Sequence, residues 1–472
     1  MLEAAAYICT YIEGNFLISA LPGLDGAEID WTASEIRIQQ IITIACWILF
    51  LTLAVFFWKK LKSEQVLWWI RAGCIWFFLW MIITLIGSCF GKWDKVLYNR
   101  SHNYDVSSEN MLQYSANQNF IILLLDHVDA REFSDLIEKY PDYKNIFSDF
   151  TYYTDMQGMY PYTLYAVPYI LTGQRYENET EFNKYFEKAM SKSPLLNMLE
   201  ERNYKIGIYY EQLKYTNQEA KNRLDNLSEH RSYVSSTWAL DKVWLKLVGL
   251  RYLPYGLKKY SVLNQDAIND LRAKKDIEVP DDYNWRNYVF YDLLTNKGME
   301  LTDQNCFRYI HLKGSHKEYD IDENAQFSEE YTSLETVLKG CMTILKEYLR
   351  QLQELQVYDN SAVIIMADHG DNTVTAENPF FLVKGFGERH EKMQFSDAAV
   401  SFADLMEIDR ALLEGKTGTA ILPFDPGEDR TRLCLWYKAF NESEHMVEYQ
   451  QTGKVGDEET FVPTGRVYDR KE

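Results

Sequence analysis

The chain has 472 residues and a formal net charge of −20, with 25% charged and 47% hydrophobic residues. This length exceeds what one hydrophobic core usually organises, so we expect at least two structural regions. The acidic balance excludes nucleic acid as a main partner, because phosphate binding needs a basic surface. The seven cysteines form no CxxC pair, which argues against a structural zinc site and a disulfide framework.

Residues 1–92 are predicted to be a membrane region with two transmembrane spans. The first span, at about 39–58, reads QQIITIACWILFLTLAVFFW and carries no charge over the length that a bilayer core requires. The second, at about 67–90, is apolar apart from Arg71, whose long side chain can reach the interface. A buried helix of a soluble protein is the alternative to each span.

The charges beside the spans predict the topology. Three lysines, at 59, 60 and 62, lie between the spans, whereas acidic residues precede the first span. The positive-inside rule places the lysine loop in the cytoplasm. We therefore predict a multi-pass protein of the cell membrane with an extracytoplasmic catalytic domain. Residues 2–21 lack the basic start and cleavage site of a signal peptide, and we interpret them as the end of an earlier span of a longer chain.

After a predicted linker at 93–117, apolar segments of strand length alternate with helical patterns. These segments are 119–125, 204–210, 306–312 and 361–367. Continuous apolar strands are typical of a parallel sheet that is covered on both faces. A helix predicted at about 329–356, from its three- and four-residue apolar spacing, connects the last two strands as a crossover.

These elements predict an α/β fold with a mostly parallel central sheet. The catalytic domain is expected to cover 118–425. Residues 216–280 mix helical and loop patterns and are interpreted as an insertion. Alternating segments near the end predict a C-terminal β-meander, 426–472, packed on the catalytic domain.

Acids and a histidine directly follow two of the predicted strands. Asp126 ends the first strand, and Asp368 and His369 follow the last. Ligands of open α/β sheets bind at the carboxyl ends of the strands, and carboxylates and imidazoles are ligands for zinc or manganese. A capped turn would explain Asp368 and His369 alone, but Asp126 at the same edge of the sheet favours a metal site.

The segment 158–173 reads GMYPYTLYAVPYILTG and places a threonine where a helix begins. Pro161 favours a non-helical entry, and Gly173 is a natural helix stop. The hydroxyl of Thr163 would then lie at the positive end of a helix, where negative charge on a phosphoryl group is stabilised. A helix cap is the alternative role for Thr163. Pro168 predicts an unusual helix, because proline removes one backbone hydrogen bond.

Four motifs in this order resemble the alkaline phosphatase and sulfatase superfamily. They are a strand that ends in an acid, the pattern T-x-x-x-x-P-x-x-L-T-G, a strand followed by HLKGSH, and a strand followed by ADHG. Within the superfamily the chain looks like the membrane-bound branch with lipoteichoic acid synthase and the lipid A phosphoethanolamine transferases. The resemblance spans about 118–410. It implies an alkaline-phosphatase-like sandwich preceded by transmembrane helices.

The resemblance also implies roles for individual residues. His316, in GSH, would contact the donor or protonate the leaving group, and His311 is a weaker candidate for substrate binding. The phosphoethanolamine transferases have a histidine shortly after ADHG, whereas here the next is His390, so a second metal is in doubt. We interpret His390 as a substrate contact, with a surface histidine as the alternative. One divalent metal, manganese before zinc or magnesium, would be bound by Asp126, Thr163, Asp368 and His369.

By resemblance, the chain is expected to be a membrane-anchored phosphotransferase. It would move phosphoglycerol or phosphoethanolamine from a phospholipid donor to a cell-surface glycan or polymer through a phosphothreonine at Thr163. A sulfatase or a phosphodiesterase of the same superfamily is the alternative. Sulfatases form their nucleophile from Cys or Ser in C/S-x-P-x-R, and the sequence here is Thr-Leu-Tyr at 163–165. An inactive membrane-tethered binding module is a third hypothesis, which predicts no dependence on metal.

Overall fold

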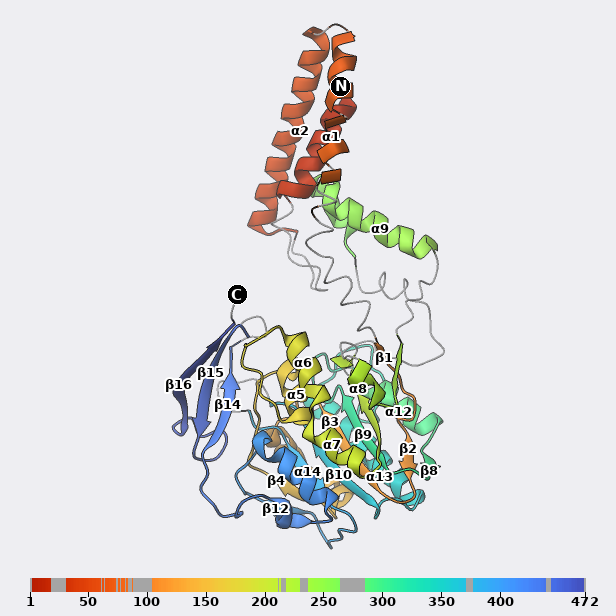
Figure 1. Cartoon of the computed structure of the whole chain (residues 1–472), viewed down its shortest axis with the longest axis vertical. Helices are drawn as coiled ribbons and strands as arrows, with labels where there is room; N and C mark the ends of the chain where they lie inside the picture. Colours follow the sequence, from red (N-terminus) through yellow and green to blue (C-terminus); the bar gives the residue numbers. More distant parts are fainter. Residues whose placement is uncertain are drawn as a thin grey trace. The chain divides into compact units, whose positions relative to one another are not determined.

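The structure is a computed structural model of the chain, which divides into two compact units (Figure 1). The membrane unit comprises Met1–Asn99 with Arg231–Asp276, and the catalytic unit comprises Arg100–His230 with Ile277–Glu472. The residues that the structure describes are 2–17, 31–60, part of 62–87, 104–210, 212–213, 218–229, 237–263, 285–370, 377–438 and 443–470.

The membrane unit contains one described helix that is long and apolar enough to cross a bilayer. This helix, α2 (Ser34–Lys60), has 27 residues and a mean hydropathy of 2.5, and it includes the first predicted span. It can anchor the protein in a membrane. The second predicted span falls partly outside the described residues, so two spans and a multi-pass topology stay predictions.

Short helices pack around α2 in the same unit. The other elements of the membrane unit are α1 (Leu2–Ile12), η1 (Glu13–Leu17), α9 (Thr237–Tyr252), α10 (Tyr255–Lys258) and η5 (Lys259–Ser261). The last three lie in the segment that was interpreted as an insertion, which therefore belongs largely to the membrane unit.

The catalytic unit is built on a seven-stranded sheet in the order β12-β4-β11-β10-β3-β9-β6. Its four predicted strands are confirmed as β3 (Asn119–Leu125), β6 (Lys205–Tyr209), β9 (Cys306–Leu312) and β10 (Ser361–Met366). They are parallel neighbours, whereas β11 (Phe381–Lys384) is antiparallel to β10 and to β4 (Thr151–Tyr153), and β12 (Gln394–Ser396) is parallel to β4. The sheet is therefore mostly parallel, as predicted.

The apolar run of β3 serves two hydrophobic cores because successive side chains of a strand point to opposite faces. Phe120, Ile122 and Leu124 pack into one core, and the residues between them pack into the other. Each core is closed by helices, which makes three layers (Figure 1). The first core includes α5 (Thr163–Thr172), α6 (Phe182–Ser191), α7 (Pro194–Glu201) and α14 (Leu405–Leu413); the second includes α4 (Ala130–Lys139), α12 (Asn287–Asn296) and α13 (Leu334–Glu354).

The crossover helix α13 is shorter than the predicted 329–356. It begins at Leu334 because the hydroxyl of Ser333 accepts a hydrogen bond from the amide of Thr336 at 3.1 Å and caps the helix. Its apolar side is buried, which agrees with the spacing from which it was predicted.

The C-terminal segment forms a three-stranded antiparallel sheet of β14 (Arg432–Trp436), β15 (His445–Gln451) and β16 (Phe461–Asp469). The buried guanidinium of Arg432 binds the carboxylate of Asp155 at 3.2 Å and connects this sheet to the rest of the catalytic unit. The remaining elements are β1 (Tyr104–Val106), β2 (Gln113–Ser115), η3 (Pro141–Phe147), β5 (Met156–Gln157), α8 (Gln218–Asn222), β7 (Leu227–Glu229), β8 (Glu300–Thr302), β13 (Val400–Ser401), η6 (Phe402–Asp404) and η7 (Gly418–Ile421).

Candidate active site

Asp126 follows β3 directly and is fully buried at the carboxyl edge of the sheet. Its backbone is paired on the side of β9, because its amide donates to the carbonyl of Leu312 at 3.1 Å and its carbonyl accepts from the amide of Ser315 at 2.9 Å. The backbone of the motif HLKGSH, which begins in β9, therefore packs directly against Asp126. The carboxylate of Asp126 is thereby held at the edge where ligands of α/β sheets bind.

Gly314 allows this close approach. Its φ is +58°, and a Cβ at this position would lie 2.4 Å from the carbonyl oxygen and 2.5 Å from the amide nitrogen of Asp126. We expect Gly314→Ala to lower the free energy of unfolding by roughly 3 kcal/mol, because backbone overlap adds to the cost of a positive φ. Denaturant unfolding of the chain measures this change.

Gly387 provides the matched control for that substitution. Its φ is +65°, but a Cβ there would meet nothing within 4 Å. Gly387→Ala should therefore lower the free energy of unfolding only by the cost of a positive φ, about 1 kcal/mol. Equal losses in the two variants would show that the contact with Asp126 contributes nothing to the effect.

Asp368 and His369 follow β10 at the same edge and are both buried. The Nδ1 atom of His369 lies 2.9 Å from the carbonyl of Gly370, which leaves Nε2 directed to the site. The amide of Gly370 donates to Oε2 of Glu377 at 2.7 Å. The turn after β10 is therefore held by a buried carboxylate from the segment that precedes β11.

Thr163 is the first residue of α5, as predicted. The helix ends at Gly173, whose left-handed conformation, with φ +65°, forms the C-cap that the sequence predicted. Pro168 lies inside the helix. The hydroxyl of Thr163 is thus at the helix N-terminus, where the backbone amides favour negative charge.

The four residues that were predicted as metal ligands come together around one atom. The Nε2 atom of His369 lies 3.3 Å from Oγ1 of Thr163, 3.5 Å from Oδ1 of Asp126 and 3.6 Å from Oδ2 of Asp368. Ligand atoms of a four-coordinate ion with bonds of about 2.1 Å lie about 3.4 Å apart. The set of donors therefore fits one divalent cation.

The charges of the site also fit a cation. Two carboxylates, Asp126 and Asp368, are fully buried, and their ion-pair partners among the described residues are histidines. The Oδ2 atom of Asp368 accepts no hydrogen bond from any described residue. Buried carboxylates are costly unless they are paired or bind a metal, so a divalent ion would balance both.

Electrostatics within the cluster shift three pKa values. Burial alone would raise the pKa of Asp126, but the imidazoles of His311 and His369 outweigh it and hold that pKa below its usual range. Burial would lower the pKa of His369, but Asp368 and Asp126 outweigh it and raise that pKa. Burial, together with the nearby His369, lowers the pKa of His127.

The structure places the other predicted histidines at different depths. His316 is half-buried, and its ring lies 5.9 Å from that of His127, which lies 5.2 Å from the ring of His369. His311 is fully buried on β9, with Nε2 3.6 Å from Oδ2 of Asp126. His316 is thus partly accessible to solvent, whereas His311 lies against the carboxylate of Asp126. The predicted roles of both histidines stay predictions.

His390 is not brought to this cluster. The antiparallel strand β11 pairs Phe381 with Met366 and Lys384 with Val363, so it carries the chain back to the opposite edge of the sheet. There, Nε2 of His390 lies 2.8 Å from Oε1 of Glu388. This placement gives no support to the predicted substrate contact.

Two residues near the cluster were missed by reasoning from the sequence, His127 and Glu377. His127 follows Asp126 directly, and a histidine beside the acid that ends a strand was a sequence signal that could have found it. Its backbone has φ +66°, and its amide donates to Oδ1 of Asp368 at 3.3 Å. Glu377 has no comparable signal, because its place depends on how the chain returns from β10 to β11.

Glu377 is expected to act as a positioning residue for the turn after β10. Glu377→Ala removes the acceptor of the Gly370 amide, and we expect roughly 10- to 100-fold weaker metal binding, the usual effect of losing a group that orients a ligand. Glu377→Gln keeps an acceptor oxygen and should lose less. Titration calorimetry with Mn²⁺ compares the variants, and an unchanged affinity in Glu377→Ala would exclude this role.

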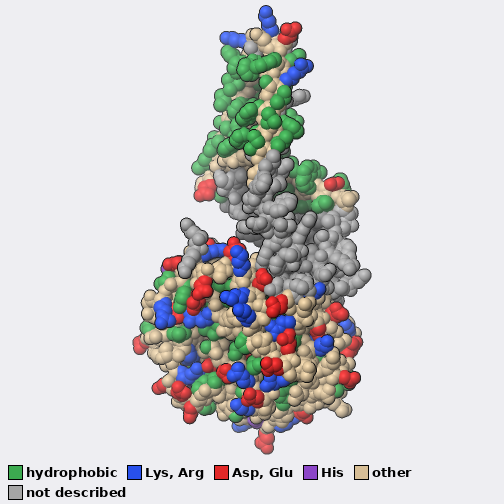
Figure 2. All heavy atoms as spheres, viewed as in Figure 1, with side chains coloured by type: hydrophobic (Ala, Val, Ile, Leu, Met, Phe, Trp, Pro, Cys, Tyr) green, Lys and Arg blue, Asp and Glu red, His purple; other side chains and the backbone are tan. Residues whose placement is uncertain are grey.

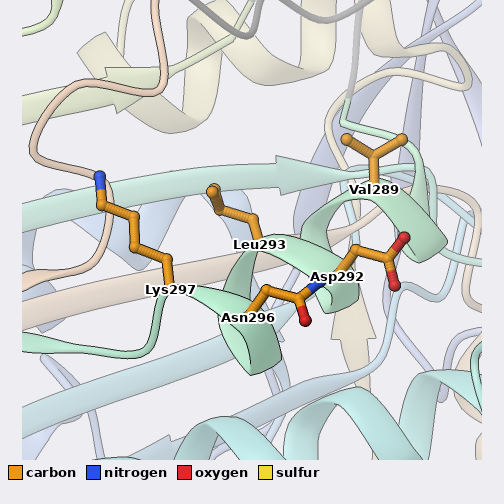
Figure 3. A pocket seen from close by; sticks show the side chains of 5 residues that line it. All are labelled: Val289, Asp292, Leu293, Asn296 and Lys297. Atoms are coloured by element: carbon orange, nitrogen blue, oxygen red, sulfur yellow. The ribbon is translucent and has the colours of Figure 1, made fainter.

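A surface pocket of the catalytic unit lies elsewhere (Figure 3). Its lining side chains come from α12 and from the residue that follows it, and include none of the cluster: Val289, Asp292, Leu293, Asn296 and Lys297.

Comparison with protein families identifies the family of the chain. The family model described as Sulfatase matches residues 118–395, which is more than half of the chain and includes β3, α5, β9 and β10. The chain belongs to the sulfatase family. No curated protein sequence matches it.

Solved structures similar to this sulfatase-family chain have low sequence identity. One is Ps i-CgsB, with 12% identity, a TM-score of 0.43, and coverage of 71% of this chain and 82% of the other. A protein in the alkaline phosphatase superfamily from Vibrio parahaemolyticus has 12% identity, a TM-score of 0.39, and coverage of 78% and 81%. The phosphonate monoester hydrolase SpPMH from Silicibacter pomeroyi has 13% identity, a TM-score of 0.38, and coverage of 75% and 89%.

Membership of the sulfatase family confirms the coarser sequence predictions. The catalytic unit has the alkaline-phosphatase-like α/β fold, in a superfamily of sulfatases and phosphoesterases whose members use a divalent metal. The cluster of Asp126, Asp368 and His369 has its ligand atoms within 4.8 Å of one another and can hold such an ion. The phosphotransferase branch, the reaction and the identity of the metal stay predictions.

Proposed function

We propose that the chain is a membrane-anchored, metal-dependent phosphotransferase that uses Thr163 as its nucleophile. One observation carries this proposal: the Thr163 hydroxyl lies at the N-terminus of α5, 3.3 Å from Nε2 of His369, an atom that also lies within 3.6 Å of the buried carboxylates of Asp126 and Asp368. A hydroxyl in this place can attack phosphorus without the modification to formylglycine that sulfatases require. The apolar helix α2 supports a lipid donor, because it would keep the site close to a bilayer.

A divalent cation, when bound, would supply charge neutralisation and lower the pKa of the Thr163 hydroxyl. Asp126, Asp368 and His369 would hold it together with Thr163, and manganese is the first choice for this mixed ligand set, with zinc or magnesium as alternatives. Glu377 orients the turn that carries two of these ligands through the amide of Gly370.

In the first step, the Thr163 oxygen attacks the phosphorus of a phospholipid after its proton has passed to solvent. The bond from phosphorus to the glycerol oxygen of diacylglycerol breaks, and the leaving oxygen takes up a proton from His316 or from water. A phosphoglycerol or phosphoethanolamine group then remains on Thr163. In the second step, a hydroxyl of a cell-surface glycan or polymer attacks the same phosphorus and loses its proton to solvent. The bond from phosphorus to the Thr163 oxygen breaks, and that oxygen takes up a proton.

The alternative is a hydrolase of the same family. Membership of the sulfatase family favours a hydrolase. Hydrolysis would need no other change in the site, because transfer and hydrolysis differ only in the group that attacks second. In this case water frees Thr163, or the substrate is a sulfate ester. The metal-site residues of the described chain would be the same for both reactions. The identities of the substrate and of the products must therefore distinguish the transferase from the hydrolase.

The experiment presents the purified full chain with phosphatidylglycerol, phosphatidylethanolamine or a sulfate ester, each with and without an oligosaccharide acceptor. Transfer predicts diacylglycerol release, a head-group mass on Thr163, and a labelled oligosaccharide. Diacylglycerol release with only free head group would favour the phosphodiesterase. Turnover of the sulfate ester without any head-group adduct would overturn the phosphotransferase proposal.

A further inference from the structure

Helix α9 exposes large apolar side chains although it is a charged helix of only 16 residues. Trp238 and Trp244 are 63% and 62% exposed, and three leucines of the helix are also exposed, at 240, 245 and 247. Figure 2 shows hydrophobic side chains gathered on the membrane unit, whereas the visible face of the catalytic unit mixes basic and acidic groups. Exposed apolar side chains of this size gathered on one helix mark an interaction surface.

The end of α9 is fixed to the N-terminal helices of the membrane unit. The Nε atom of Arg251 donates to the carbonyl of Gly14 at 3.2 Å, and a Cβ on Gly14 would meet the ring of Tyr252 at 2.4 Å. Beyond α9, the buried ammonium of Lys258 lies 3.8 Å from the buried carboxylate of Glu13. The helix α9 is therefore part of the membrane unit by specific contacts and not only by position in the sequence.

These contacts place α9 near one end of α2. Both η1 and α10 pack against α2, and Glu13 of η1 lies near Thr43 in the first half of that helix, whereas Lys59 and Lys60 lie at its far end. The positive-inside rule assigns the lysine end to the cytoplasm, so the end that carries α9 faces the outside. This is also the side on which the predicted topology puts the catalytic unit.

The side chains of α9 are arranged for a membrane surface. At 100° per residue, Leu240, Trp244 and Leu247 share one side of the helix. Lys242 and Lys246 lie on the opposite side, together with the exposed side chains of Trp238 and Leu245. Tryptophan and lysine are enriched where a helix meets lipid head groups. With 16 residues and four charges, α9 is too short and too polar to cross the bilayer.

We propose that α9 lies in the outer head-group region of a phospholipid bilayer. Leu240, Trp244 and Leu247 enter the acyl boundary, and Lys242 and Lys246 reach lipid phosphates. The inference rests on the membrane anchoring in the proposed function and not on the reaction. It gives the catalytic unit a second membrane attachment, because α9 belongs to a segment between two parts of that unit.

Photocrosslinking of the full chain in phosphatidylcholine and phosphatidylglycerol vesicles tests this placement. A benzophenone amino acid replaces Trp244 on α9, Ile48 in the middle of α2, or Tyr331, an exposed residue of the catalytic unit. Mass spectrometry then identifies lipid and protein adducts. We expect roughly tenfold more lipid adduct at Trp244 than at Tyr331, and a comparable yield at Ile48, since both would contact acyl chains.

The positions separate this inference from the proposed anchoring. Lipid adducts at Ile48 but not at Trp244 would overturn the placement of α9 and leave the anchoring of α2 intact. A protein adduct in place of lipid at Trp244 would also overturn it and identify a protein partner for this face. Lipid adducts at neither position would overturn both the placement and the anchoring.

Discussion

Replacement of Thr163 by alanine is expected to abolish turnover, with a loss of at least about 10³-fold in kcat, because the variant lacks the oxygen atom that we propose carries the transferred group. The hydroxyl lies 3.3 Å from Nε2 of His369, and Thr163 is half-buried at the first turn of α5, outside both hydrophobic cores. The midpoint of thermal unfolding should therefore change little. Mass spectrometry of the chain after incubation with phospholipid should find no added head group.

Thr163→Ser is the matched control because it keeps the attacking oxygen. We expect this variant to retain measurable turnover and to acquire the head-group mass on Ser at the same position. If Thr163→Ala retained full turnover, Thr163 would not be the nucleophile. Activity lost equally in both variants, together with a lowered unfolding midpoint, would point instead to a helix-capping role.

Asp368→Asn is expected to have an effect of similar size on activity through loss of metal. The Oδ2 atom of Asp368 is buried, accepts no hydrogen bond from the described residues, and lies 3.6 Å from Nε2 of His369. An amide keeps the shape of the side chain but removes the charge that would balance a cation. We expect at least about 10³-fold loss of turnover, because charge stabilisation and nucleophile activation both depend on the ion.

Stability measurements separate a metal ligand from a structural carboxylate. Metal that binds only the native state stabilises it by about 2.7 kcal/mol at a hundredfold excess over Kd. We expect Mn²⁺ to raise the unfolding midpoint of the unmodified chain but not that of Asp368→Asn. Without metal the variant should be at least as stable, because one of two buried like charges is gone.

Asp409 provides the matched control for Asp368. It is a buried carboxylate of α14, and burial raises its pKa well above the ordinary value. Asp409→Asn should therefore keep the full response to Mn²⁺. A response that persists in Asp368→Asn, or disappears in Asp409→Asn, would contradict the assignment of the metal site to Asp126, Asp368 and His369.

The parallel part of the sheet could be predicted from the sequence because its strands are buried on both faces. Such strands read as continuous apolar runs, and the run at 119–125 coincides with β3. The antiparallel part could not be predicted in the same way. β4 and β12 have three residues each, and a strand of this length is too short for an alternation of apolar and polar residues to be recognised.

The candidate site was predictable where its residues end strands and less so elsewhere. Asp126, Asp368 and His369 follow from strand ends, because parallel strands bring their carboxyl ends to one edge. Thr163 depended on the resemblance, since no local pattern says that α5 begins beside that edge. His390 was considered because it is the next histidine after ADHG, where the resembling transferases have one, but β11 reverses the chain and carries it away from the cluster.

The position of β3 in the sheet has a consequence for biosynthesis. Its two neighbours, β9 and β10, begin only at Cys306 and Ser361, although β3 ends at Leu125. A growing chain must therefore carry a seven-residue apolar segment without either partner until most of the protein has been made. Products truncated before Cys306 would leave both edges of β3 unpaired, and we expect them to aggregate or to be degraded rather than to persist as partly active enzyme.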